Sequence, residues 1–243
     1  MIIRDCTVRD IPRCAEIWKD CFPEDKDFCD YYFNNVHPLG KSLVCEACGT
    51  VTSYLNILDF DANCKGRLLK SSYIYAVSTH SDFRNKGYMS AIFNRALELC
   101  EDKDFTFLIP SVNGIYEKFG FKTIARQKSM QCDISGNDCL ICNDISHLNM
   151  IYEQFCKKFN LSVVRSYDWW KIIYETAVSD GFSFIANDGA YAVVSDDEIA
   201  ELAYISEHYR DRLNIKHKTL KLPKVMARGN MDFDNNYIAM MLN

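Results

Sequence analysis

The sequence predicts an α+β protein in which strands and amphipathic helices form mixed α/β layers. Residues 73–77 read Tyr-Ile-Tyr-Ala-Val, a run of aromatic and β-branched residues that is typical of a strand. Over residues 89–100, apolar residues recur at helical spacing and form one stripe. The tripeptide Asn-Asp-Gly at 187–189 separates two apolar segments, 182–186 and 190–194, which predicts a β-hairpin.

The composition is that of a globular protein. The 243 residues are 48% apolar and 25% charged, enough to build a core, which excludes disorder as the dominant state. The net charge of −5 excludes a global basic field for nucleic acid or anionic membranes, but it is compatible with a local site for a small anion. A homo-oligomer is also compatible with the sequence.

The chain has no apolar run of the ~20 residues that a membrane-spanning helix needs. Its first residues, Met-Ile-Ile-Arg-Asp-Cys, do not resemble a signal peptide. Together with 12 cysteines, these features lead us to expect a cytoplasmic protein with reduced thiols.

The elements of the first half follow in order from periodicity and turn residues. Asp10 is predicted to cap the first helix, and Gly120 to end the last one. The predicted elements are a strand at 2–4, helices at 11–22 and 28–34, strands at 42–47, 50–60 and 73–77, a helix at 88–100, a strand at 105–109, a helix at 113–119 and a strand from 121.

A change of composition at 133–143 predicts a linker. The second half then has two helical patterns and the hairpin around 187–189. The segment 199–206 is compatible with either a strand or a helix. The predicted elements are helices at 145–159 and 169–175, strands at 182–186 and 190–194, the ambiguous segment 199–206 and an apolar run at 237–242.

Two Cys-x-x-Cys pairs, 45–48 and 139–142, could together supply four thiolates to a structural zinc ion. Their separation is several times the ~15–20 residues that are usual between such pairs. The first pair also lies where a strand–turn–strand pattern is predicted. We therefore expect ordinary cysteines and no metal.

The most informative segment connects the strand at 73–77 to the helix at 88–100. It contains Arg84, Lys86 and Gly87, and the helix begins directly after the glycine. Free N–H groups in a first helical turn bind phosphate groups, and a glycine allows close approach of the ligand. The alternative is a solvated turn with surface cations. The Walker motif and the dinucleotide fingerprint are both missing from the sequence.

This segment resembles the acetyl-CoA loop of GCN5-related N-acetyltransferases, the GNAT superfamily, whose pattern is [RQ]-x-x-G-x-[GA]. Arg84 and Gly87 match the pattern, and Met89 departs from its small final residue. A second family signature, a tyrosine followed by Phe-Gly-Phe, is matched from Tyr116 to Phe121. The resemblance implies a central mixed twisted sheet flanked by helices.

The residues of both motifs resemble those of the enhanced-intracellular-survival (Eis-like) branch, whose members have two GNAT units in tandem. We therefore expect a catalytic acetyl-CoA-binding domain at 1–133 and a degenerate GNAT-like domain at 140–243. The second half has no basic glycine loop before a helix, and the chain is too short for the sterol-carrier-like domain that often follows.

The resemblance also implies the roles of individual residues. Acetyl-CoA is the expected co-substrate, and Tyr116 corresponds to the general acid that protonates the leaving thiolate. The alternative role for Tyr116 is packing on the sheet. The residues expected to bind acetyl-CoA are Val77 and Thr79 through their main-chain groups, the loop residues Arg84, Asn85, Lys86, Gly87, Tyr88 and Met89, and Asn113.

An acidic turn and a nearby aromatic are the candidates for the acceptor site. Asp25 and Asp27 would attract a cationic amine, and Tyr32 would line the pocket. A solvated turn and core packing are the alternatives. The sequence does not identify the general base; Glu46, His80 and the carboxylate of Asn243 are candidates on chemistry alone.

These features predict an N-acetyltransferase that moves acetyl from acetyl-CoA directly to a primary amine of a small molecule or a protein lysine. The alternative is a catalytically idle acyl-CoA-binding or scaffold module with a protein partner. A third hypothesis is an aminoacyl or longer-acyl transferase on the same fold.

Overall fold

The computed structural model describes residues 1–23, 28–126, 130–133, 140–196, 198–219, 224–229 and 235–238. Two compact units are present. The first comprises Met1–Phe60, Lys70–Lys122 and Ala227–Met231; the second comprises Asp61–Leu69, Thr123–Met226 and Asp232–Asn243. The division into domains at 1–133 and 140–243 stays a prediction. Within the described residues, no helix is long and apolar enough to cross a membrane.

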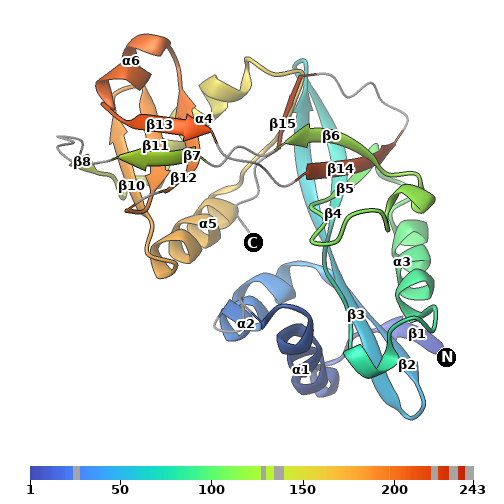
Figure 1. The fold of residues 1–243 in the computed structure, drawn as a ribbon. Coiled ribbons are helices and arrows are strands. Elements are labelled where there is room, and N and C mark those ends of the chain that lie inside the picture. The colour runs from blue at the N-terminus through green and yellow to red at the C-terminus, as the bar shows by residue number, and fades with distance from the viewer. Residues whose placement is uncertain are drawn as a thin grey trace. The chain divides into compact units, whose positions relative to one another are not determined.

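A mixed sheet contains the strands of the first unit (Figure 1). β1 pairs antiparallel with β2, and β2 pairs antiparallel with β3, whereas β4 and β5 are parallel. The predicted mixed sheet is therefore confirmed. The strands, in sheet order, are β1 (Ile2–Asp5), β2 (Lys41–Ala47), β3 (Thr50–Cys64), β4 (Arg67–Thr79), β5 (Phe105–Leu108), β14 (Lys224–Gly229) and β6 (Lys122–Arg126).

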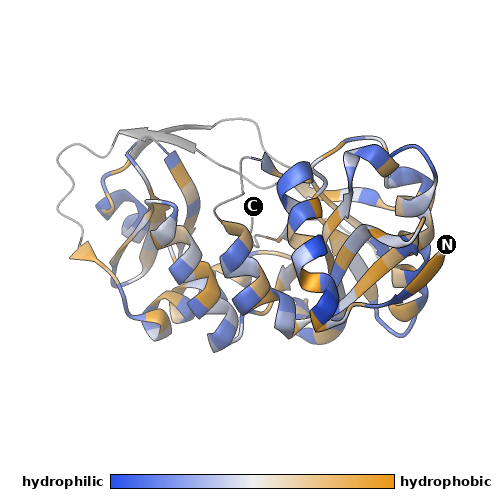
Figure 2. Ribbon diagram, turned by 90° about the horizontal axis from the view of Figure 1, so that it is seen from below, coloured by the Kyte–Doolittle hydropathy of each residue, from blue (hydrophilic) through white to orange (hydrophobic). Residues whose placement is uncertain are grey.

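Three helical segments cover this sheet, with α1 and α2 on one face and α3 on the other (Figure 1). They are α1 (Ile11–Cys21), α2 (Phe28–Tyr31), which continues as a π-helical turn over Tyr32–Val36, and α3 (Tyr88–Leu99). In Figure 2 the helices alternate between hydrophobic and hydrophilic colours, as amphipathic helices do. Trp18 of α1 stacks on Tyr32 with ring centroids 4.4 Å apart, and both side chains are buried.

Two sequence predictions need correction here. Asp10 precedes α1, but its carboxylate does not cap the helix; it accepts hydrogen bonds from Arg4 and Thr7 instead. The prediction of a helix at 113–119 is wrong, because only a 3₁₀ turn forms there, at Glu117–Phe119. Gly114, with a φ of 84°, takes a left-handed conformation that interrupts a right-handed helix.

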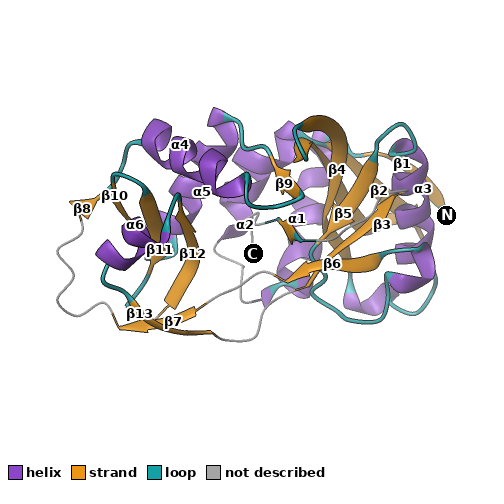
Figure 3. Cartoon of the chain, turned by 90° about the horizontal axis from the view of Figure 1, so that it is seen from above, coloured by secondary structure: helices purple, strands orange, loops and turns teal. Residues whose placement is uncertain are grey.

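A second sheet, also drawn in Figure 3, organises the second unit. The predicted hairpin is confirmed, since Asn187 of β10 pairs with Ala190 of β11. The ambiguous segment 199–206 is a strand, β12. In sheet order the strands are β13 (Lys216–Thr219), β7 (Met130–Asp133), β12 (Glu198–Tyr204), β11 (Ala190–Val194), β10 (Ser183–Asn187) and β8 (Leu140–Ile141).

Helices α4 (Ile145–Cys156) and α5 (Tyr167–Ser179) pack with one face of that sheet. Tyr191 and Val193 of β11 belong to this core, whereas their neighbours Ala190 and Ala192 join a second cluster with Leu213, which follows α6 (Glu207–Arg212). This division follows the two-residue period of a strand. Sequence analysis missed the short strands β9 (Leu161–Val163) and β15 (Asn236–Tyr237), which pair in parallel.

A buried ion pair lies in the core of the second unit. Arg165 donates two hydrogen bonds to Glu201, at 2.8 and 2.9 Å, and the two side chains are only 2% and 1% exposed. The hydroxyls of Tyr191 and Tyr237 also donate to the Glu201 carboxylate, at 3.1 and 2.7 Å. The Arg165 guanidinium lies 4.1 Å from the ring centroid of Tyr152. Such a pair is stable only when its charges and hydrogen bonds are satisfied together.

Candidate functional site

β4 and β5 separate at the centre of the first unit. Their parallel register runs from Ser71–Phe105 to Tyr73–Phe107, while β4 continues to Thr79. Ala76, between these points, has a φ of 57°, which is unusual for a residue other than glycine and interrupts the regular strand. The C-terminal part of β4 therefore extends beyond its register with β5, and main-chain groups near Val77 can pair with an added extended ligand.

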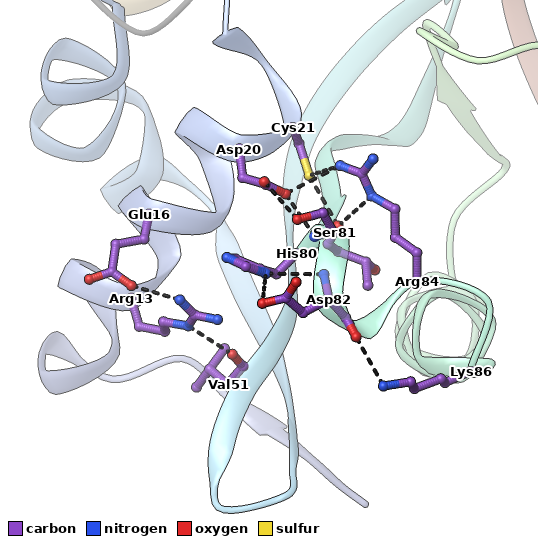
Figure 4. Close-up of polar contacts among 11 residues, drawn as sticks. Arg13, Glu16, Asp20, Cys21, Val51, His80, Ser81, Asp82, Arg84 and Lys86 are labelled. Atoms are coloured by element: carbon purple, nitrogen blue, oxygen red, sulfur yellow. Dashed lines mark hydrogen bonds and ion pairs between the residues drawn. The ribbon is translucent and has the colours of Figure 1, made fainter.

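The loop after β4 is held by the end of α1 (Figure 4). The Asp20 carboxylate accepts hydrogen bonds from the amide and the hydroxyl of Ser81, at 2.8 and 2.9 Å. It also pairs with the Arg84 guanidinium at 3.3 Å. Burial acts to raise the pKa of Asp20, but the hydrogen bonds from Ser81 and the charges of His80 and Arg84 outweigh it and lower the pKa.

Arg84 thus braces the loop rather than extending freely from it. Besides the pair with Asp20, its Nε donates to the carbonyl of Thr79 at 3.1 Å, and its Nη2 lies 3.5 Å from the Cys21 thiol. The Lys86 ammonium folds back in the same way and donates to the carbonyl of Asp82 at 2.9 Å. These bonds fix the path of the chain that leads into α3.

The loop ends in two left-handed residues that start α3. Asn85 and Gly87 have φ values of 61° and 84°. Gly87 is the N-cap, and no side chain there bonds to the first turn of the helix. Three first-turn residues, Tyr88, Met89 and Ser90, present amides that have no carbonyl partner inside the helix. A Cβ at Gly87 would meet no atom within 4 Å, so the glycine is required by its conformation and leaves the amides accessible.

Tyr116 lies against α3, in contact with Phe93 at a centroid distance of 5.3 Å. Burial raises its pKa to about 12. Burial and then the nearby Tyr116 also raise the pKa of Tyr73, which belongs to the last β4–β5 pair. No described residue forms a hydrogen bond with the Tyr116 hydroxyl. The phenol therefore lies close to the point at which β4 and β5 separate.

The candidate acceptor residues have different positions. Tyr32 is buried, and its hydroxyl lies 2.8 Å from that of Tyr54, so the structure gives it a packing role. Asp25 and Asp27 lie outside the described residues. Asn113 is exposed in a turn rather than at the start of a helix, because the predicted helix does not form. The assignments of these residues to ligand binding stay predictions.

The candidate bases are engaged in local contacts. Nδ1 of His80 accepts the amide of Asp82 at 3.3 Å. Glu46 is paired with Arg4 at 3.0 Å. Asn243 lies outside the described residues. Neither described candidate is thus a free base in this arrangement.

No group of three or more potential metal ligands occurs among the residues that the structure describes. Cys45 is buried within β2, and Cys48 is exposed in the β2–β3 turn. Cys142 is partly exposed, whereas Cys139 lies outside the described part of the chain.

The sequence profile of the acetyltransferase (GNAT) domain matches residues 2–124, more than half of the chain. The chain belongs to the GNAT acetyltransferase domain family. This membership indicates acyl transfer from an acyl-CoA. No curated protein matches the sequence.

Solved structures share the GNAT fold over nearly the whole chain. A conserved protein of unknown function from Enterococcus faecalis V583 superposes with a TM-score of 0.77 at 14% identity, over 93% of this chain and 72% of that one. A GCN5-related N-acetyltransferase from Anabaena variabilis gives 0.75 at 13% identity, over 93% and 72%. Eis1 from Mycobacterium abscessus gives 0.69 at 13% identity, over 93% and 73%. At these identities the likeness shows the fold.

Two features of the GNAT site could not be found from sequence patterns. Asp20 lies 61 residues before Ser81, with no motif around it. Ala76 looks like an ordinary strand residue, and only its backbone angle distinguishes it. Both positions depend on how segments that are distant in the sequence pack together.

Proposed function

We propose that this protein is an N-acetyltransferase that moves the acetyl group of acetyl-CoA directly to a primary amine of a small molecule or a protein lysine. We place it in the tandem Eis-like branch, with a catalytic GNAT domain at 1–133 and a degenerate one at 140–243. The fold shared with Eis1 over 93% of the chain supports this placement.

One observation carries the proposal: β4 runs past its register with β5 and leads into a helix whose first-turn amides are accessible. These features fit the two parts of acetyl-CoA. The main-chain groups of Val77 and Thr79 would pair with the amides of the pantetheine arm. The amides of the loop from Arg84 to Met89 would hold the pyrophosphate, and Lys86 would add positive charge. Asn113, in the turn after β5, would also contact the cofactor.

Acetyl-CoA supplies an activated thioester, and the chain supplies polar groups around it. The main-chain amide beside Ala76 would stabilise negative charge on the carbonyl oxygen. Tyr116, with a pKa of about 12, stays protonated at neutral pH and would donate a hydrogen bond to the departing sulfur. Since a thiol has a pKa of about 8.5, full transfer of the Tyr116 proton is uphill. The proton that completes the thiol would therefore come from the amine.

The acceptor amine would enter from the side of α1 and α2. Asp25 and Asp27 would attract its positive charge, and Tyr32 would shape the pocket through its packing against Trp18. The amine must lose a proton before it attacks, and a water chain could carry that proton because His80 and Glu46 are engaged elsewhere.

A calorimetric titration with acetyl-CoA tests the loop. We expect micromolar affinity, weakened at least about 30-fold by Gly87→Glu, because a carboxylate in the open space beside the first-turn amides repels a pyrophosphate. Gly181→Glu is the matched control: its φ of 83° and open surroundings impose the same backbone strain in the second unit. Absence of binding by folded wild type would refute the proposal.

Turnover is then measured with a panel of amines. Because the chain has 12 cysteines, acetylated amines are identified by mass spectrometry rather than with a thiol reagent. Acetyl-CoA binding without acetylation of any amine or protein lysine would favour the alternative, an idle acyl-CoA-binding module.

Asp20→Ala should raise the KM for acetyl-CoA by about 5–20-fold, since it removes the charged acceptor of Ser81 and Arg84 and loosens the loop. The kcat at saturation should change less than about threefold, because Asp20 contacts Ser81 and Arg84 of the loop and not Tyr116. Glu16→Ala provides the control: it removes a carboxylate from the same helix, where its partner is Arg13. Equal KM values for the two variants would contradict a bracing role.

A further inference from the structure

Two cysteines face each other in the first unit, at a place that the proposed transfer does not use. The Sγ atoms of Cys6 and Cys14 are 4.0 Å apart. Cys14 is fully buried on α1, whereas Cys6, directly after β1, is partly exposed. Both are held by defined backbone, because the amide of Cys6 donates to the carbonyl of Ser42 at 2.9 Å. The thiol of Cys6 is thus accessible to a small oxidant, whereas the thiol of Cys14 is buried beside it.

The surroundings favour a thiolate on Cys6. The Cys14 thiol, and then the imidazole of His37, lower the pKa of Cys6 to about 6, against the effects of burial and of Asp10. The hydrogen bond with Cys6, and then burial, raise the pKa of Cys14, which therefore keeps its proton. The buried Nε2 of His37 has no hydrogen-bond partner among the described residues. It is therefore available to form a hydrogen bond with an oxygen atom placed on the sulfur of Cys6.

We propose that Cys6 and Cys14 form a peroxide-reactive pair that closes into an intramolecular disulfide. The Cys6 thiolate attacks one oxygen of hydrogen peroxide, the O–O bond breaks, and a sulfenic acid and hydroxide form. The hydroxide takes the Cys14 proton, and the resulting Cys14 thiolate attacks the Cys6 sulfur and displaces a second hydroxide, which takes up the proton that Cys6 had released. Two thiols lose two electrons in total, and one peroxide becomes two waters.

The geometry supports closure at this pair. A disulfide needs an S–S distance near 2.05 Å, so the two sulfur atoms must approach by about 2 Å. Only the seven residues 7–13 separate the cysteines, and they already turn back from β1 into α1. Cys48 is more exposed, but its neighbour within 4 Å is the hydroxyl of Tyr88, which cannot resolve a sulfenic acid. The inference does not depend on the proposed function.

The test uses the full-length reduced chain with one equivalent of hydrogen peroxide, followed by alkylation with N-ethylmaleimide and digestion with trypsin without reductant. Trypsin places Cys6 in peptide 5–9 and Cys14 in peptide 14–19. We expect these two peptides, joined by a disulfide, to be the dominant oxidised species. Reduction with dithiothreitol should separate them. Recovery of both peptides in alkylated form, with oxidation elsewhere, would overturn the proposal.

Three variants assign the roles. Cys6→Ser should abolish the link, and Cys48→Ser, which removes the exposed thiol of the β2–β3 turn, should leave it unchanged. Cys14→Ser, which keeps a hydrogen-bond donor beside Cys6 but cannot form a disulfide, should leave a sulfenic acid on Cys6 that dimedone labels. Dimedone labelling of Cys48 in place of Cys6 would overturn the assignment of Cys6 as the reacting thiol. The peptide map of the wild type decides the question even where a variant folds poorly.

Discussion

Tyr116→Phe should lower kcat by about 100-fold or more while the Kd for acetyl-CoA stays within about threefold of the wild-type value. The change removes only the hydroxyl that would donate a hydrogen bond to the departing sulfur, and loss of one positioned donor to charge that develops in the transition state costs about 10²–10³-fold. The ring contacts with Phe93 and Phe121 remain, so the fold should be retained. Steady-state rates by mass spectrometry and a calorimetric titration measure the two quantities.

The pH dependence gives an independent check. Because burial raises the pKa of Tyr116 to about 12, its hydroxyl keeps the proton at every lower pH. The wild-type kcat should therefore not fall through ionisation of Tyr116 between pH 8 and 10. Tyr167→Phe is the control, since it deletes the hydroxyl of an exposed tyrosine at the start of α5, outside the proposed acetyl-CoA site. A Tyr116→Phe variant with the wild-type kcat would show that Tyr116 only packs on the sheet.

Glu201→Gln should destabilise the second unit by about 3–5 kcal/mol, because it leaves the Arg165 guanidinium as an uncompensated buried charge. Chemical denaturation followed by circular dichroism measures the loss. Glu198→Gln is the matched control, because it removes a carboxylate from the same strand, β12. Among the described residues, Glu198 forms no ion pair. Its effect should be within about 0.5 kcal/mol.

A double variant separates charge from packing. Arg165→Met combined with Glu201→Gln removes the positive charge and keeps an amide oxygen for the hydroxyls of Tyr191 and Tyr237. It should be more stable than Glu201→Gln alone. If Glu201→Gln unfolds like the wild type, the ion pair is not buried in solution.

Local sequence patterns do not specify the separation of β4 from β5. The strand at 73–77 and the helix at 88–100 follow from local patterns, and the structure contains both. Neither pattern specifies the left-handed Ala76, because this conformation costs free energy that only the surrounding packing can offset. The wrong prediction of a helix at 113–119 has a local cause. Gly114 adopts a left-handed conformation that helical spacing does not predict.

By itself, the sequence determined the alternation of strands and helices, the hairpin at 187–189 and the basic glycine loop before α3. These features depend on preferences of residues within about ten positions of one another. Only the tertiary structure decided that β14 lies between β5 and β6, that Asp20 braces the loop, and that Arg165 meets Glu201. Each of these contacts joins segments that are distant in the chain, and their energy depends on burial and charge pairing that exist only after folding.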